Sequence, residues 1–184
     1  MQPFRHRSIL LPDYDYSQPG WYMITLVTDQ RKNYFGEIVF GEMQENPIGK
    51  LVRREWLHIP QRFLGLEIDE FVVMPNHIHG IITILDTAQN NNTLPMKFEG
   101  FGHPTQGSIP TIIRSFKAAV TLRVRRMLGD PKACIWQRNY YERVIRNERG
   151  LEAARLYIQE NPDNWAFDQE NVGRITDNDS GTAD

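Results

Sequence analysis

The sequence predicts an α+β fold: a central antiparallel β-sheet with about three helices, in a single domain. Three observations predict it. Apolar runs rich in valine, isoleucine and aromatic residues recur in the first half of the chain. Apolar residues at helical spacing follow capping residues in three places, and no internal repeat or second core interrupts the 184 residues. A chain of this length accommodates one domain with a substantial core.

The first predicted strands follow an irregular arm. Residues 1–20 carry Pro3, Pro12 and Pro19 and are typical of irregular structure. Residues 21–28, WYMITLVT, have the aromatic and β-branched content of a strand. After a turn-like stretch, residues 34–43 are expected to form a second strand that pairs with the first.

Three helices are expected from caps and periodicity. Asn46-Pro47 starts the first, which ends near Pro60. Ser108 caps a second helix over residues 109–128. Asn147 caps a third over 148–160, which the Asn161-Pro162 pair ends because proline disfavours a helical residue before it. Between them, residues 66–85 predict two central strands joined by a tight turn, and residues 136–145 a last strand.

These elements predict the domain boundaries. The domain extends over residues 21–165, and the polar, turn-rich stretch 86–107 is expected to form an exposed loop within it. Residues 166–184 carry more acidic than basic side chains and are expected to form an acidic, flexible tail.

Composition bounds the class of protein. The lone cysteine, Cys134, excludes an internal disulfide, which indicates a cytoplasmic setting. No stretch has the length of apolar sequence that a membrane span needs. The formal net charge is only −2, yet basic residues outnumber acidic ones between positions 110 and 150. This clustering indicates a face for a polyanion, or a solvated helix surface.

His77 and His79 open the second central strand. Because side chains alternate faces along a strand, both imidazoles should point the same way while Ile78 points into the core. Such a pair is able to hold one metal ion, and burying two unpaired imidazoles in a sheet would be costly without a partner. The alternative is a pair of histidines at a strand edge with no ligand.

The last helix places a second set of polar groups together. Tyr157 and Asn161 are four residues apart and therefore share one face of that helix. If the helix packs across the sheet, they would meet the histidines. Otherwise Tyr157 is simply an amphipathic residue at the edge of the core.

These motifs carry a resemblance. MPNHIHG after a strand resembles the His-hydrophobe-His (HUH) motif of single-tyrosine transposases. The segments WQRNYYERVIRNE and YIQENP resemble REP-associated tyrosine transposases, the branch related to the small insertion-sequence transposases. The resemblance covers about residues 21–162, with the motifs in the same order.

The resemblance implies a ferredoxin-like HUH fold and a metal-dependent enzyme that cleaves and rejoins single-stranded DNA hairpins of the REP type through a 5′-phosphotyrosine. It implies metal ligation of Mg²⁺ or Mn²⁺ by His77 and His79, with Asn161 where insertion-sequence relatives often have glutamine, and Tyr157 as the catalytic nucleophile. Tyr140 and Tyr141 are rival nucleophiles. The residues expected to bind the DNA backbone are Arg114, Lys117, Arg123, Arg125, Arg126, Arg138, Arg143 and Arg146. The resemblance leaves open whether the protein is a monomer or a homodimer.

Two other functions compete with this one. The first is a catalytically silent protein that binds DNA hairpins and has a regulatory role. The second is a small metal-dependent hydrolase that uses the histidine pair. The hydrolase needs an acidic third ligand, and near the strands the sequence offers only Asp69, Glu70 and Asp86, at no recognisable spacing.

Overall fold

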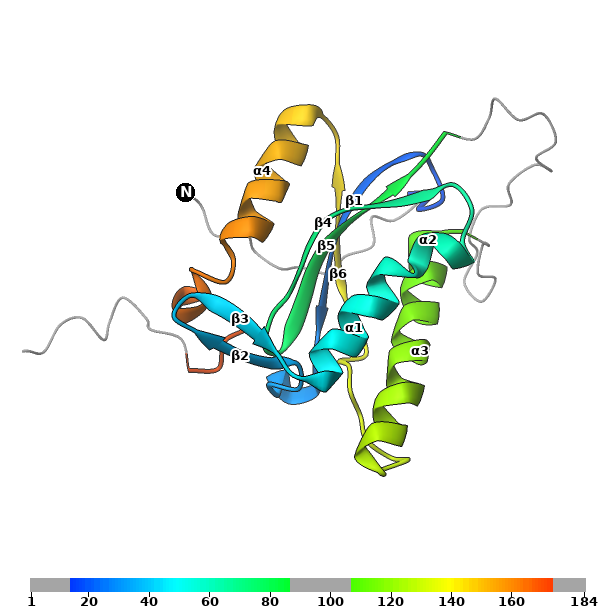
Figure 1. Ribbon diagram of the computed structural model, residues 1–184. Helices are drawn as coiled ribbons and strands as arrows, with labels where there is room; N and C mark the ends of the chain where they lie inside the picture. The colour runs from blue at the N-terminus through cyan, green and yellow to red at the C-terminus, as the bar shows by residue number, and fades with distance from the viewer. Residues whose placement is uncertain (1–13, 87–106, 174–184) are drawn as a thin grey trace, which may run out of the picture.

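A computed structural model describes residues 14–86 and 107–173. One four-stranded antiparallel sheet forms its centre, in the order β4-β5-β1-β6 (Figure 1). Its strands are β1 (Gly20–Val27), β4 (Leu66–Val73), β5 (His77–Ile84) and β6 (Tyr141–Ile145). The α+β class and the antiparallel sheet predicted from the sequence are confirmed.

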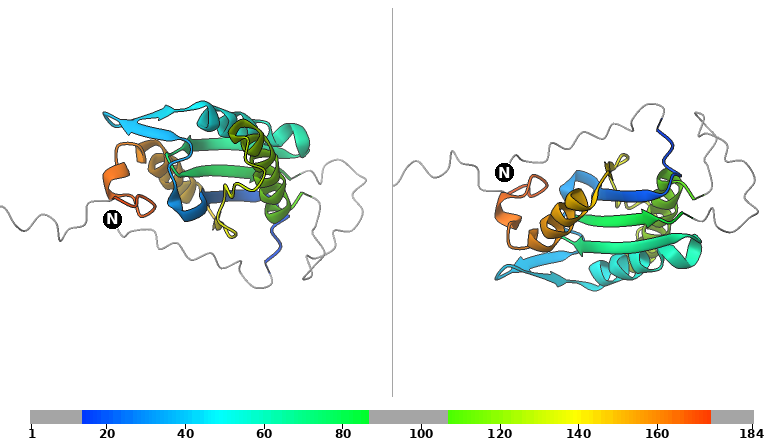
Figure 2. Two further views of the ribbon diagram at one scale, coloured as in Figure 1. Left: turned by 90° about the horizontal axis from the view of Figure 1, so that it is seen from below. Right: turned by 90° about the horizontal axis from the view of Figure 1, so that it is seen from above.

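Helices cover both faces of this sheet (Figures 1 and 2). On one face lie α1 (Pro47–Leu57), the short α2 (Ile59–Arg62) and α3 (Ile109–Leu128). On the other lies α4 (Glu148–Glu160). We call these the α1/α3 face and the α4 face. None of the helices in the described part of the chain is long and apolar enough to cross a membrane.

Local chemistry starts these helices where the sequence predicts. The side chain of Asn46 accepts hydrogen bonds from the first amides of α1, and the side chain of Asn147 does the same for α4. Ser108 precedes α3, but its hydroxyl contacts Thr111 and caps no amide. Gly129 ends α3 in the left-handed conformation that glycine adopts at little cost.

The prediction that residues 34–43 form one strand paired with β1 is wrong. The segment forms a separate hairpin of β2 (Gly36–Val39) and β3 (Glu42–Glu45). Phe40 and Gly41 have positive φ at its turn, so the chain folds back on itself and the two strands satisfy each other's hydrogen bonds. Both edges of β1 are already occupied, by β5 and by β6.

The last predicted strand is shorter than expected. Only Tyr141–Ile145 pairs with β1, while Trp136 makes a single bridge to Thr28. The carbonyl groups of residues 137–139 accept hydrogen bonds from the ammonium group of Lys117 on α3. They therefore do not contribute to a strand ladder.

The two faces of the sheet bury two separate apolar clusters. The larger lies on the α1/α3 face and includes Ile24, Ile78 and Trp56. The smaller lies on the α4 face and includes Ile81, Ile145 and Ile158. Beyond the smaller cluster, the α4 face continues into polar residues.

Candidate active site

His77 and His79 lie side by side on the α4 face of β5. Both are fully buried, and their ring centroids are 4.5 Å apart. Ile78 between them points into the larger core cluster, as the alternation of a strand requires. The structure thus brings the two predicted histidines together on one face.

Asn76 determines the tautomer of His77. The Nδ2 amide of Asn76 donates to the carbonyl groups of Arg31 (3.1 Å) and Glu170 (2.7 Å), so its Oδ1 faces the Nδ1 of His77 at 2.9 Å as an acceptor. His77 therefore carries its proton on Nδ1 and has its lone pair on Nε2. A second group that orients a histidine in this way is typical of metal sites.

Thr25 holds His79 in the same manner from the neighbouring strand. The two residues are direct partners in the register of β1 and β5, and the Thr25 hydroxyl lies 2.8 Å from the Nδ1 of His79. Donation from Nδ1 to this hydroxyl leaves the lone pair of His79 on Nε2.

Asp168 completes a cluster of three possible ligands. One ligand atom from each of His77, His79 and Asp168 lies within 4.8 Å of those of the other two. Asp168 follows the short 3₁₀ helix Trp165–Phe167, and the amide of Glu170 donates to its carboxylate at 2.6 Å. The carboxylate of Glu170, itself buried, pairs with Arg31 at 2.7 Å.

The position of Asp168 corrects two expectations. Residues 166–173 are predicted to belong to a flexible tail outside the domain, but Asn76, the residue before β5, donates to the carbonyl of Glu170 in this segment. The hydrolase alternative needs an acidic third ligand that the sequence near the strands does not offer, and Asp168 is such a group. The remainder of the predicted tail, 174–184, most of the N-terminal arm and most of the 86–107 loop lie outside the described residues.

Tyr157 approaches the histidines from α4. Its hydroxyl lies 3.4 Å from the Nε2 of His79, and the two ring centroids are 5.2 Å apart. Burial raises the pKa of Tyr157 above its usual value, and the negative charge of Asp168 adds to the rise. The phenol is therefore protonated at neutral pH, and a cation bound beside Asp168 would offset part of that rise.

Asn161 lies one helical turn after Tyr157, as predicted. Its Nδ2 donates to Asp168 at 3.3 Å, and its hydrogen bond to Tyr157 opposes the rise in the pKa of that tyrosine. Its Oδ1 is buried and has no hydrogen-bond partner among the described residues. A buried carbonyl oxygen without a donor is costly in isolation, and a cation would satisfy it.

The rival tyrosines occupy other positions. Tyr140 packs against the larger apolar cluster, on the α1/α3 face. Tyr141 pairs with Thr25 in the register of β6 and β1, so it faces the same side as His79 but lies two strands away. Two strand spacings amount to about 10 Å. Of the three tyrosines, Tyr157 is the one within hydrogen-bonding distance of a histidine.

The eight predicted DNA-binding residues do not form one surface. Arg114, Lys117, Arg125 and Arg138 line a groove beside α3. Arg143 and Arg146 are exposed at β6, and Arg126 is exposed near the end of α3. Arg123 pairs with the buried Glu55 of α1 at 3.3 Å. Arg123 therefore has a partner within the protein, and its contact with the DNA backbone stays a prediction.

The donor set fits a divalent cation. Two imidazole nitrogens and a carboxylate, with a carbonyl oxygen nearby, suit Mn²⁺, and the oxygen donors also suit Mg²⁺. By the Irving–Williams order such a site binds Zn²⁺ more tightly than Mn²⁺ in vitro. Three ligands from the protein would leave positions open for a phosphate oxygen.

Comparison with known proteins finds a sequence relative and solved structures that share the fold. No protein-family model matches the chain. An uncharacterized protein of Haemophilus influenzae is 40% identical over 166 residues, covering 89% of this chain and 91% of its own length.

The solved structure of a REP-associated tyrosine transposase bound to a REP hairpin aligns with a TM-score of 0.52 and 18% identity. That alignment covers 92% of this chain and 77% of the transposase. A Deinococcus radiodurans protein with a provisional transposase assignment aligns with a TM-score of 0.45 and 17% identity, over 86% and 96% of the two chains.

Proposed function

We propose that this chain, which belongs to one family with the Haemophilus influenzae protein and has the fold of the REP-associated tyrosine transposase, is a metal-dependent nuclease and strand transferase. Its substrate is a single-stranded DNA hairpin, which it cleaves and rejoins through Tyr157. The observation that supports this most is the 3.4 Å approach of the Tyr157 hydroxyl to His79, beside the cluster of His77 and Asp168. One site would then contain the nucleophile, the ligands of a cation and open coordination positions for a phosphate oxygen.

The chemistry follows from the residues at this site. The oxygen of Tyr157 forms a bond to the scissile phosphorus while the bond from phosphorus to the 3′ oxygen breaks. The phenol proton ends on that oxygen, which leaves a 5′-phosphotyrosine and a free 3′-OH. The number of phosphoester bonds is unchanged, so the reverse step rejoins a strand without an external energy source. A divalent cation held by His77, His79 and Asp168 would polarise the phosphate and stabilise the charge of the transition state.

The other polar residues would position these groups. Asn76 and Thr25 hold the two imidazoles in the tautomer that presents Nε2 to the cation. Asn161 joins Tyr157 to Asp168 and is proposed as a further oxygen ligand. Arg143 lies on the α4 face of β6, and Arg146 follows that strand. Both would contact DNA phosphates.

A cleavage assay tests this proposal. Labelled single-stranded hairpins from the repeats that flank the gene are incubated with Mn²⁺ or Mg²⁺ and separated on a denaturing gel. We expect a covalent protein–DNA adduct with the wild type, and no adduct with Tyr157→Phe or His77→Ala. Tyr141→Phe is the matched control, because it removes a hydroxyl from the same face and should retain the adduct.

The results also separate the competing functions. An adduct that is lost in Tyr141→Phe but retained in Tyr157→Phe would transfer the role of nucleophile to Tyr141. Tight hairpin binding without cleavage in either metal would establish the silent DNA-binding protein instead.

Asp168 favours a second candidate, a metal-dependent phosphodiesterase that uses water as its nucleophile. The carboxylate supplies the acidic ligand that such an enzyme needs. This enzyme would release cleaved DNA without any adduct, and its activity would survive Tyr157→Phe. The same gel therefore distinguishes hydrolysis from strand transfer.

A further inference from the structure

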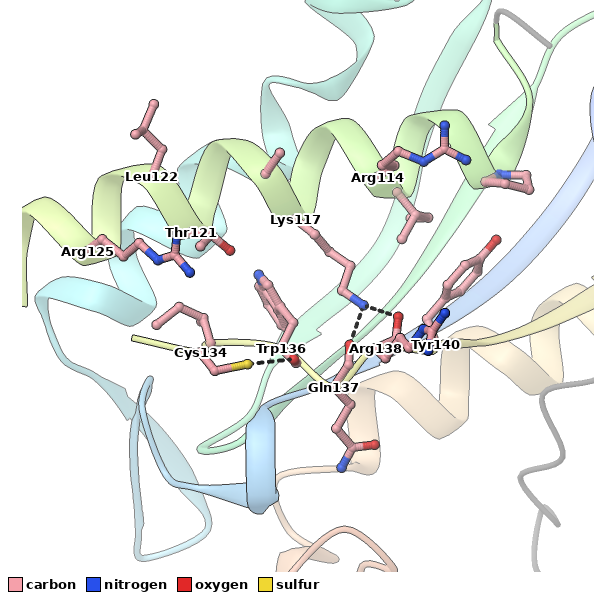
Figure 3. A pocket seen from close by; sticks show the side chains of 14 residues that line it. Arg114, Lys117, Thr121, Leu122, Arg125, Cys134, Trp136, Gln137, Arg138 and Tyr140 are labelled. Atoms are coloured by element: carbon pink, nitrogen blue, oxygen red, sulfur yellow. Dashed lines mark hydrogen bonds between the residues drawn. The ribbon is translucent and has the colours of Figure 1, made fainter. Parts of the chain in front are cut away.

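A groove lies on the α1/α3 face, away from the histidine pair (Figure 3). It runs between α3 and the segment of residues 134–140 and has a volume of about 620 Å³. Its floor is apolar, with Ile113 and Trp136 contributing from the larger core cluster. The groove has no part in the chemistry proposed above.

The side chains at its walls are cationic. Arg114 and Arg125 come from α3, and Arg138 comes from the opposite wall (Figure 3). Arg114 and Arg125 are eleven residues apart, which corresponds to about 16 Å along a helix. Of the described residues that line the groove, none is acidic. A ligand here is therefore anionic, and its charges are distributed along the groove rather than at one point.

Lys117 has a structural task in this groove. Its Nζ donates to the carbonyl groups of Gln137 (2.6 Å), Arg138 (3.3 Å) and Asn139 (3.3 Å). Burial lowers the pKa of Lys117 to about 8. Its donors hold the opposite wall in place, and the Nε of Arg125 donates to the carbonyl of Ala133. The exposed side chains of Arg114 and Arg138 are therefore the cations left for a ligand.

The floor offers apolar surface. Trp136 is buried against the rings of Phe35 and Phe116 and supports this floor from below. Leu122, more than half exposed at the edge of the groove, adds apolar surface beside the cations. Alternating phosphates and bases match a groove with arginines along an apolar floor. A fully acidic peptide would leave that floor uncovered.

We propose that this groove binds a short unpaired segment of single-stranded DNA, with phosphates at Arg114 and Arg138 and a base on the apolar floor. The proposal rests on the proposed function, which makes DNA the partner. The beginning of β6 links the two surfaces, since Tyr140 lines the groove while Tyr141 faces the side of His79. A strand that leaves the groove around this edge reaches the face that carries Tyr157.

The single cysteine offers a direct probe. Cys134 is exposed and lines the groove, and the chain has no other cysteine. The rate at which a thiol reagent modifies Cys134 is measured with and without a ten-residue oligothymidine, which forms no hairpin. We expect the oligothymidine to slow the reaction at least fivefold, in the Tyr157→Phe variant as well as in the wild type.

A charge-matched pair of variants makes the test specific. Arg114→Ala/Arg138→Ala should abolish the protection and weaken oligothymidine binding about tenfold. Two lost phosphate contacts should also reduce the slope of log K against log salt by about 1.4. Lys50→Ala/Lys132→Ala removes two exposed cations from outside the groove and should leave the protection of Cys134 intact.

Three outcomes would overturn the proposal. One is an unchanged modification rate in the presence of bound oligothymidine. Another is protection that persists in Arg114→Ala/Arg138→Ala, and the third is protection by an oligoglutamate peptide but not by oligothymidine, which would indicate a protein partner. Protection of Cys134 without any cleavage of hairpins would retain the groove and contradict the nuclease. Cleavage of hairpins without protection of Cys134 would support the nuclease and contradict the groove.

Discussion

The two faces of the central sheet are built for different purposes. The α1/α3 face is packed almost entirely with apolar side chains, among them the fully buried Trp56 and Phe116 in edge-to-face contact. The α4 face has a small apolar cluster and then a buried polar group around His77 and His79. One face therefore supplies the stability with which the other can bury histidines and a tyrosine.

Strand β5 belongs to both faces at once. His79 faces the site, and the next residue, Gly80, faces the core. A Cβ at Gly80 would lie 2.5 Å from the Trp56 ring, so the indole packs directly on the strand. Adjacent substitutions on this strand should therefore have separable effects, one on metal binding and one on stability.

The largest expected effect is on metal affinity. His79→Ala removes one of the three proposed ligands and should weaken Mn²⁺ binding by roughly a thousandfold, measured by calorimetry on the purified protein. The free energy of unfolding without metal should change by no more than about 2 kcal/mol, because the core on the other face is untouched. If the variant binds Mn²⁺ as tightly as the wild type does, His79 is not a ligand.

The next largest effect is on stability. Gly80→Ala forces a methyl group into the Trp56 ring and the Cβ of Phe71, and should lower the free energy of unfolding by about 3 kcal/mol. Chemical denaturation measures this loss. Gly173→Ala is the control, because its new Cβ would meet only Asn171 at an ordinary distance of 3.8 Å. Equal stabilities of the two variants would contradict the tight packing of β5 on α1.

A smaller effect is expected from the residue that orients His77. Asn76→Ala removes the acceptor for His77 and the donor to Glu170, and should weaken Mn²⁺ binding about 10- to 100-fold. Asn76→Asp restores the acceptor but not the donor, so its affinity should lie between the two. The nitrogen resonances of the His77 ring in NMR spectra should report the change of tautomer. If His77 keeps the same tautomer in Asn76→Ala, Asn76 does not position His77.

The smallest effect concerns a buried carboxyl group on the α1/α3 side of β6. Burial raises the pKa of Glu142 to about 7, and the Tyr16 hydroxyl opposes this rise. Between about pH 4.5 and 7 the native state holds a proton that the unfolded state has lost, so stability falls as the pH rises through this window. Glu142→Gln should abolish that fall and be more stable than the wild type at pH 8, by on the order of 1 kcal/mol.

Thermal unfolding at pH 5 and pH 8 tests this difference. Glu148→Gln changes an exposed carboxylate nearby and should follow the pH profile of the wild type. If Glu142→Gln does so too, the carboxyl group of Glu142 titrates at its ordinary value.

Much of the site was predictable because it depends on short-range periodicity. The alternation of a strand put His77 and His79 on one face, and the helical repeat put Tyr157 and Asn161 on another. Asp168 could not be found in this way. It lies in irregular structure, where no period relates sequence distance to direction, and its acidic surroundings are typical of a solvated tail.

The hairpin of β2 and β3 escaped prediction for a different reason. Its short apolar run, Ile38 to Phe40, is typical of a strand, but the run contains no information about which strand it pairs with. The glycine at position 41 was the available signal, because glycine readily adopts the positive φ that a tight hairpin turn requires.

The contact between Asn76 and Glu170 has a consequence for the newly made protein. These residues are 94 positions apart, and a ribosome needs roughly 5 to 20 seconds to add that many amino acids. For most of that interval the chain has its histidine pair but lacks both Tyr157 and Asp168. A nascent or prematurely terminated chain without these residues has an incomplete candidate site, so any activity that needs the whole site arises only after the rest of the fold has been synthesised.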